Sequence, residues 1–298
     1  MKHLKSILLI GSMVLLSAAC QREAAHVDGP SETVTFDVSL PADAMTKATG
    51  DGSQIDRLRF WAFNLDKDDL FYNEYEVQDG HVSIQMNMTR GVHYTLCFWA
   101  EKAVPDNESP FYFFTNAVVQ VYYQTMVNQD KFDCFSATLN DFTVGGSTQA
   151  VVLKRPFAQL NVGLSYADTT AAGAKGFHAK DFRTRLEFTA PNRLDLKTGT
   201  VSGEQDILNV VSYKDAPWDA LVEVKDGDVI DPEKSFTRAA FCYILADDTH
   251  DQLETVFFEM YAENIGGVQY GCTKLFNDVP LSVNKQTNVL GAALNDFN

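Results

Sequence analysis

Residues 33–40 read TVTFDVSL, a stretch in which every second residue is large and apolar. Its apolar members are Val34, Phe36, Val38 and Leu40. A period of two is the side-chain period of a β-strand, so the stretch predicts a first strand at about 33–40 with one buried and one solvated face. PADAMTKATGDGS follows, and its Pro, Ala and Gly residues predict an exposed loop over 41–54.

The same alternation recurs along the chain, and helical periodicity is scarce. It is found in residues 82–88, 92–98, 158–164, 182–188, 255–258, 268–275 and 287–294. The turn residues Thr89-Arg90-Gly91 predict that 82–88 and 92–98 form a hairpin. Residues 111–126 are aromatic and β-branched and fit either a strand or a short helix. Many short strands with regular turns predict an all-β fold of antiparallel β-sandwiches.

The length predicts two such sandwiches in series. The chain has 298 residues, and a Gly/Ser/Thr-rich stretch over 141–149 precedes the apolar run Ala150 to Leu153. We therefore place the boundary near 150, which gives an N-terminal sandwich over 21–150 and a C-terminal sandwich over 151–298.

Composition argues against nucleic-acid binding. The chain has 24 Lys and Arg against 40 Asp and Glu, a formal net charge of -16, and we find no basic stripe. An acidic surface of this kind repels phosphate backbones.

Residues 1–20, MKHLKSILLIGSMVLLSAAC, predict a secretory signal peptide. They combine a positive start, an apolar stretch and small residues before Cys20, which resembles a bacterial lipobox. We expect Cys20 to carry lipid (diacylglycerol, then palmitate) and to hold the protein in the outer membrane at the cell surface. The alternative is a plain signal peptide cut near Cys20.

The chain shows no motif for catalysis, a metal or a cofactor, so we predict that it is not an enzyme. Cys97, Cys134, Cys242 and Cys272 lack close spacing, and we favour buried thiols over a disulfide. His81 and His93 fall on neighbouring predicted strands and fit a pair of surface histidines.

Two further groups have open interpretations. Asp66, Asp68 and Asp69 fit an exposed hairpin turn better than a calcium loop. Trp61, Trp99 and Trp218 could form a sugar-stacking platform, although burial on both faces of their strands is favoured.

Two longer segments carry a resemblance to a known family. VLKRPFAQLNV at 152–162 and VPLSVNKQTNVLG at 279–291 resemble segments of Bacteroides-type, Mfa-like fimbrillin lipoproteins, which are relatives of the type V pilins. YTLCFWA at 94–100 and LKTGTVSG at 196–203 fall in the expected order. Pro156, after an arginine in an exposed position, suits the start or edge of a strand.

The resemblance implies two transthyretin-like β-sandwiches in tandem. It also implies cleavage in the loop after the first strand, where Lys47 is the one basic residue, followed by replacement of that strand by one from a partner subunit. The strand to be displaced would carry Val34, Phe36, Val38 and Leu40.

The function expected from this resemblance is structural or adhesive, in a fimbria or pilus. Seven residues follow Gly291, fewer than a donor strand needs, so we expect a tip or accessory subunit. Expected partners are other fimbrial subunits or a host or bacterial surface ligand. The alternative is a non-polymerising surface lipoprotein that binds glycan or protein.

Overall fold

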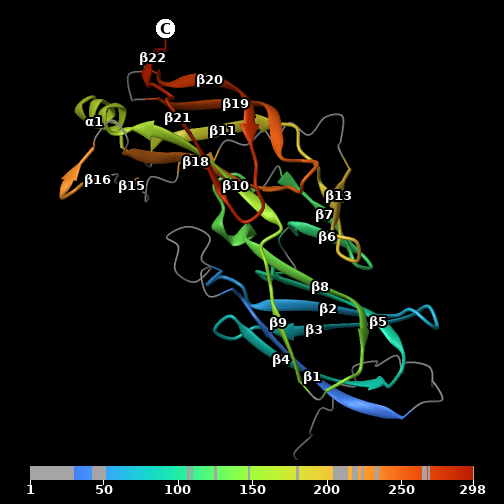
Figure 1. The fold of residues 1–298 in the computed structure, drawn as a ribbon. Helices are drawn as coiled ribbons and strands as arrows, with labels where there is room; N and C mark the ends of the chain where they lie inside the picture. Colours follow the sequence, from blue (N-terminus) through green and yellow to red (C-terminus); the bar gives the residue numbers. More distant parts are fainter. Residues whose placement is uncertain are drawn as a thin grey trace, which may run out of the picture.

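The computed structural model is an assembly of β-sheets with one α-helix among the residues that it describes (Figure 1). The described residues are 30–41, 52–105, 108, 110–123, 126–146, 148–178, 181–203, 214–216, 221–222, 225–231, 235–263, 267 and 269–297. No helix within these ranges is both long and apolar enough to cross a bilayer.

The N-terminal half forms two facing sheets, in the lower part of Figure 1. One has the order β4-β1-β9, with β4 at His81–Thr89, β1 at Ser31–Ser39 and β9 at Thr148–Val152. The other has the order β3-β2-β5-β8, with β3 at Asp69–Glu76, β2 at Arg57–Asn64, β5 at His93–Glu101 and β8 at Cys134–Thr143. Their facing apolar rows form one hydrophobic core.

The C-terminal half also has two principal sheets. The first has the order β15-β18-β10-β21, with β15 at Leu221–Val222, β18 at Phe236–Leu245, β10 at Phe157–Ser165 and β21 at Gln286–Leu290. The second has the order β14-β11-β19-β20-β22, with β14 at Lys214–Asp215, β11 at Arg183–Phe188, β19 at Gln252–Glu263, β20 at Gln269–Pro280 and β22 at Asn295–Phe297.

A further sheet combines strands from both halves of the chain. Its order is β13-β12-β7-β6, with β13 at Thr200–Ser202, β12 at Arg193–Asp195, β7 at Val118–Val121 and β6 at Tyr112–Thr115. Its apolar side belongs to the same core as the C-terminal sheets and packs on the outer face of β2 and β5. The remaining elements are α1 at Tyr166–Ala174, a 3-10 turn at Asp130–Phe132 and the hairpin of β16 at Lys225–Asp226 with β17 at Val229–Ile230.

The two halves repeat one topology. β1 lies between antiparallel β4 and parallel β9, and β10 lies in the same way between antiparallel β18 and parallel β21. In the facing sheets, β2 pairs with β3 and β5, and β11 pairs with β14 and β19. The prediction of an all-β sandwich fold is thus confirmed. Residue 150 lies within β9, which pairs with β1, and the division at 150 stays a prediction.

The predicted hairpin of 82–88 with 92–98 is wrong. β4 pairs with β1, whereas β5 pairs with β2 and β8 in the facing sheet. Both strands direct their apolar residues into the space between the two sheets, so the turn at 90–92 takes the chain across that space instead of back along the same sheet. Gly91 permits the crossing because its φ of 77° is a left-handed conformation that glycine adopts without strain.

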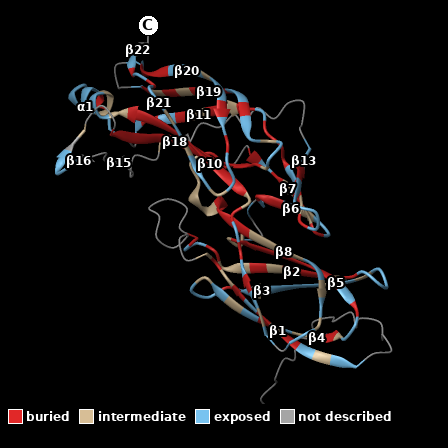
Figure 2. Cartoon of the chain, viewed as in Figure 1, coloured by how far each residue is buried: buried red, intermediate tan, exposed pale blue. Residues whose placement is uncertain are grey.

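Two strands depart from the predicted pattern of one buried and one solvated face. β5 and β10 are buried along almost their whole length on both faces (Figure 2). Residues 111–126, left open between strand and helix, contain the strands β6 and β7. Helix α1 has no apolar stripe that sequence could reveal. Ser165 caps its N-terminus, since the Ser165 hydroxyl accepts a hydrogen bond from the Asp168 backbone N–H at 3.1 Å.

Candidate functional site

Strand β1 is inserted between two neighbours and is the candidate functional element of the N-terminal half. Ser31–Ser39 runs antiparallel to β4, from Thr89 back to His81. On its other side, residues 35–39 run parallel to residues 148–152 of β9. Its backbone therefore completes a sheet in which β4 and β9 would otherwise be separated.

The predicted apolar row of β1 is the row that the core buries. Val34, Phe36, Val38 and Leu40 expose 0%, 0%, 1% and 8% of their surface. Phe36 is central, because its ring centroid lies 5.8 Å from that of Phe60, 6.0 Å from Phe98 and 5.6 Å from Phe142. These distances are those of ordinary aromatic packing, so Phe36 joins β1 to the facing sheet.

The opposite side of β1 is solvated and makes only exposed polar contacts. Thr33 donates a hydrogen bond to Asn87 and Asp37 pairs with His81, both on β4. On the other side, at the N-terminal end of the apolar row, Glu32 pairs with Arg90 next to β4. Exposed pairs of this kind contribute about 0–1 kcal/mol each. The position of β1 between β4 and β9, which we call the seat of β1, is therefore held by its backbone hydrogen bonds to these strands and by its apolar row.

The other predicted site residues lie outside the described part of the chain. This applies to Cys20, the candidate lipid site, and to Lys47, the candidate cleavage site. The structure describes the chain up to Pro41 and again from Gly52, so Lys47 lies between the two described segments. Both assignments stay predictions.

The two sequence motifs that carry the family resemblance meet as neighbouring strands. β10 contains the Phe157-to-Val162 part of the first motif, and β21 contains the second half of the other, paired in parallel from Gln159–Gln286 to Gly163–Leu290. Side-chain amides link them, buried on β10 and exposed on β21, since Asn161 donates to Asn288 at 2.9 Å and Gln286 donates to Gln159 at 3.1 Å.

Arg155 extends this link and corrects the prediction of an exposed arginine. It is only 7% exposed and forms two hydrogen bonds with the Asp133 carboxylate, at 2.6 and 2.7 Å. A third guanidinium N–H donates to the side chain of Asn284, just before β21, at 3.0 Å. Pro156 stands directly before β10, as its missing N–H predicts.

The charge state of this pair follows from two opposing effects. Burial raises the pKa of Asp133 to about 6, while hydrogen bonds and charge from Arg155 act to lower it. The carboxylate is therefore ionised at neutral pH, in agreement with its two-point contact with the guanidinium. Such a pair fixes the position of β10 against β8 and β21, and both of its members are buried.

Comparison with known proteins places the chain in a family. Residues 28–298 match a family described as one of unknown function (DUF6562). The chain belongs to that family. No curated protein matches it.

Several solved structures resemble this DUF6562 chain in fold. They include a proposed adhesin from Bacteroides ovatus, with 11% identity, TM-score 0.46 and coverage of 91% of this chain and 95% of that one. A proposed cell adhesion protein from Bacteroides uniformis has 11% identity, TM-score 0.45 and coverage of 89% and 96%. The fimbrial anchor protein Mfa2 from Porphyromonas gingivalis has 15% identity, TM-score 0.37 and coverage of 76% and 78%. These are the kinds of surface protein that the sequence resemblance named, and at these identities their roles do not transfer to this chain.

Trp61 and Trp99 of the DUF6562 chain do not form an exposed platform. Trp61 and Trp99 are 3% and 0% exposed and pack against Phe114 of β6, with ring centroids 5.7 and 5.9 Å away. The Trp99 indole donates to Glu101, a buried carboxylate that also accepts from Arg57 and Arg59. The sugar-stacking interpretation of this pair is wrong, because the sheet β13-β12-β7-β6 covers both rings. Trp218 lies outside the described residues.

Cys97, Cys134, Cys242 and Cys272 are free and buried, as predicted. Burial raises the thiol pKa of Cys97 and of Cys272 to about 12, and it also raises those of Cys134 and Cys242. A thiol in this state is a poor nucleophile at neutral pH.

The histidines and acidic turn residues do not converge on a centre either. His81 contacts Asp37 and His93 contacts Asp141, each at 2.5 Å, so the two histidines have separate partners. Asp66 and Asp68 lie in the exposed turn between β2 and β3, as predicted. Within the described ranges, no group of three or more His, Cys, Asp or Glu side chains could hold a metal ion.

Proposed function

We propose that the chain is a fimbrillin-type protein of the cell surface, a tip or accessory subunit that joins a partner by exchange of strand β1. The observation that carries the proposal is the seat of β1, which lies between β4 and β9 and buries Phe36 against the facing sheet. The role is structural or adhesive and includes no catalytic step.

The energetics of the seat explain why exchange would need a partner. Burial of a large apolar side chain contributes about 1.5–3 kcal/mol, so the four side chains of the β1 row contribute roughly 6–12 kcal/mol as an upper value. Loss of β1 would expose this surface and the unpaired edges of β4 and β9. An empty seat would be unstable, and removal of β1 has to be coupled to insertion of another strand.

The seat also defines what a replacing strand must look like. Its residues at the positions of Val34, Phe36 and Val38 have to be apolar, with an aromatic or other large residue in the centre. The intervening residues face solvent and can be polar, as Thr35 and Asp37 are. The backbone ladder supplies affinity and the apolar row supplies register, which is recognition by β-augmentation.

In this proposal the chain is first anchored in the outer membrane through lipid on Cys20. Where a protease then cuts after Lys47, the seat opens, and β1 and the lipid are separated from the rest of the chain. Ala292 and Leu294 are buried, and β22 pairs with β20, so residues 292–297 complete the chain's own sheet.

The test is a strand-exchange assay combined with the mass of the native protein. Protein extracted from cells is expected either to start at an acylated Cys20 or, where the seat has been opened, at Ala48. A chain with a protease site introduced at Lys47 is cut and then incubated with a labelled peptide of residues 30–41. We expect uptake of that peptide, and no uptake of a matched peptide that carries Phe36→Asp, because a carboxylate cannot enter the core. Failure of the cut chain to exchange any peptide while it remains folded would refute strand exchange.

A further inference from the structure

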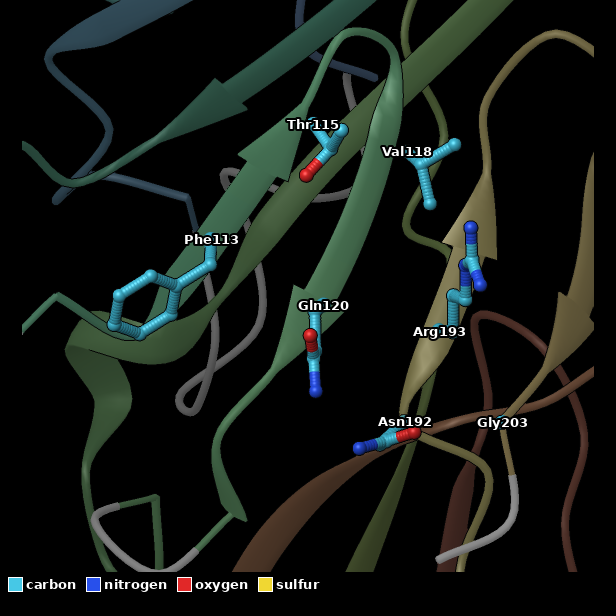
Figure 3. Close-up of a pocket in the computed structure, with 7 residues that line it drawn as sticks. All are labelled: Phe113, Thr115, Val118, Gln120, Asn192, Arg193 and Gly203. Atoms are coloured by element: carbon cyan, nitrogen blue, oxygen red, sulfur yellow. The ribbon is translucent and has the colours of Figure 1, made fainter.

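A hollow of about 370 Å³ lies on the outer face of the sheet β13-β12-β7-β6, and no role above uses it (Figure 3). Strand register places its principal side chains in one row, since Phe113 of β6 pairs with Gln120 of β7, and Gln120 pairs with Arg193 of β12. Directly paired residues share a face, about 5 Å apart on adjacent strands. Figure 3 shows Gln120 between Phe113 and Arg193, with Asn192 beside them.

The hollow combines one cation with amides that have spare hydrogen-bonding capacity. Arg193 is exposed and forms no ion pair with any described residue. Asn192 is only 3% exposed, its backbone oxygen accepts from Val121, and its side-chain amide has no hydrogen bond within the described part of the chain. Asn192 lines the hollow, and neither of its amide atoms is a fully enclosed polar atom without a partner, so a ligand can hydrogen bond to this amide in place of solvent.

Gly203 leaves room for this amide. Its φ is 81°, and a Cβ atom there would lie 2.7 Å from Asn192 Oδ1 and 2.9 Å from Cβ of Arg193. Both the backbone conformation and the space therefore require glycine at the border of the hollow.

An exposed aromatic surface forms the other end of the row. Phe113 is 44% exposed, and its ring centroid lies 4.5 Å from that of Tyr122, which is also exposed. The two rings offer an apolar platform beside polar donors. A flat ring of C–H groups that carries hydroxyls on its rim is complementary to such a surface.

We propose that this hollow binds a sugar residue that carries a carboxylate, with the sugar ring on Phe113, the carboxylate on Arg193 and hydroxyls on Gln120 and Asn192. Guanidinium is the donor that suits a carboxylate, because two parallel N–H groups match its two oxygens. Asp195 lies one row further along β12, but it does not line the hollow, and its carboxylate accepts from the Lys197 backbone N–H. The net charge of -16 disfavours a polyanion, so a single acidic sugar within a mostly neutral glycan is the class that fits.

The test measures binding of defined sugars to the chain with β1 in place, and it is independent of strand exchange. The probes are methyl glucuronide and sialyllactose, compared with methyl glucoside and lactose, by saturation-transfer NMR and titration calorimetry. We expect the acidic sugars to bind about tenfold or more tightly than their neutral counterparts, with binding that weakens as salt rises.

Matched variants locate the site. Arg193→Gln is expected to reduce binding of the acidic sugars at least about tenfold and to remove their advantage over neutral ones, and Phe113→Ala to weaken both kinds. The controls are Arg90→Gln and Tyr166→Ala, which change an exposed arginine and an exposed aromatic residue elsewhere, and which should bind like the unchanged chain. All four positions are solvent-exposed, so melting temperatures should agree. Equal binding of acidic and neutral sugars, unchanged binding by Arg193→Gln, or no saturable binding at concentrations on the order of 10 mM would overturn the proposal.

Discussion

Strands β1 and β10 occupy equivalent positions in the two halves of the chain and are held there in different ways. Each lies between one antiparallel and one parallel neighbour. β1 buries one face, and its side-chain hydrogen bonds are exposed. β10 buries both faces, and its segment is connected to its surroundings by the buried contact of Arg155 with Asp133 and by the half-buried contacts of the buried amides of Gln159 and Asn161.

The difference indicates which strand could be replaced. A strand held by a ladder and an apolar row can be matched by any peptide with the same alternation. A strand held by buried amides and an ion pair cannot, because a substitute that lacks those groups leaves their partners without hydrogen bonds. Topology alone would make both strands equally suitable for exchange, and the side chains decide between them.

The largest effect is expected from Arg155→Met, which removes the cation next to β10. It leaves the Asp133 carboxylate buried without its ion pair, and we expect a loss of about 3–5 kcal/mol in the free energy of unfolding. Loss of Arg155 also moves the folded pKa of Asp133 further above its present value of about 6. A carboxyl whose pKa is higher in the folded state stabilises the fold below its unfolded pKa, and that stability is lost as pH rises through the folded pKa.

The unfolding free energy of the variant should therefore fall further below that of the unchanged chain as pH rises from about 5 to about 8. Urea denaturation at both pH values measures this. An unfolding free energy within about 1 kcal/mol of the unchanged chain would contradict the view that the pair holds β10.

The second-largest effect is expected when the same change, valine to threonine, is made in β1 and in β10. Val34→Thr in β1 and Val162→Thr in β10 each bury a hydroxyl in place of a methyl group, and each should cost about 1–3 kcal/mol. Only Val34→Thr should also speed release of β1 from a chain cut after residue 47, which size-exclusion chromatography with a labelled N-terminal segment can follow. Equal release from both variants would mean that the seat of β1 is not an independent unit.

A smaller effect is expected from the amide link between β10 and β21. Asn161→Ala should cost about 1–2 kcal/mol, since it leaves the Asn288 side chain without its donor at 2.9 Å. A double-mutant cycle with Asn288→Ala should give a coupling of about 1 kcal/mol. Zero coupling would show that the two side chains stabilise the fold separately.

The smallest effect is expected at the solvated side of β1. Asp37→Asn removes the charge opposite His81, where both side chains are half exposed. We expect a change of about 0–1 kcal/mol, which decreases with added salt. A thermal melt in low and high salt measures it, and a loss above about 2 kcal/mol would mean that polar contacts, and not the apolar row, hold β1.

Sequence predicted the position of β1 well because alternation is a local signal. Val34 to Leu40 alternate without interruption, and each member points where the pattern requires. The turn at 89–91 joins two different sheets, which alternation does not reveal, because alternation shows which face of a strand is buried but not which sheet the strand joins. The burial of Trp61 and Trp99 depends on β6, which no local pattern near either residue reveals.

The buried pair and the hollow could not be predicted, because their members are distant in sequence. The sequence around Arg155 predicts an exposed residue before a strand. Its burial follows from its contacts with Asp133 and Asn284, which are far from it in sequence. Phe113, Gln120 and Arg193 form a row only through the pairing of β6, β7 and β12. No spacing in the chain marks them as a group, and only the register brings them together.

The seat of β1 also has a mechanical consequence. A pull on the chain at residue 30, directed along the strand, acts on the ladder to β4 in shear, so the paired residues from Ser31 to Ser39 resist together. The ladder to β9 adds resistance over residues 35–39 and lies at the far end of the strand from the pull. A pull across the strand would instead open the pairs one after another at much lower force. A chain tethered through its N-terminal end would therefore hold best when tension follows the direction of β1.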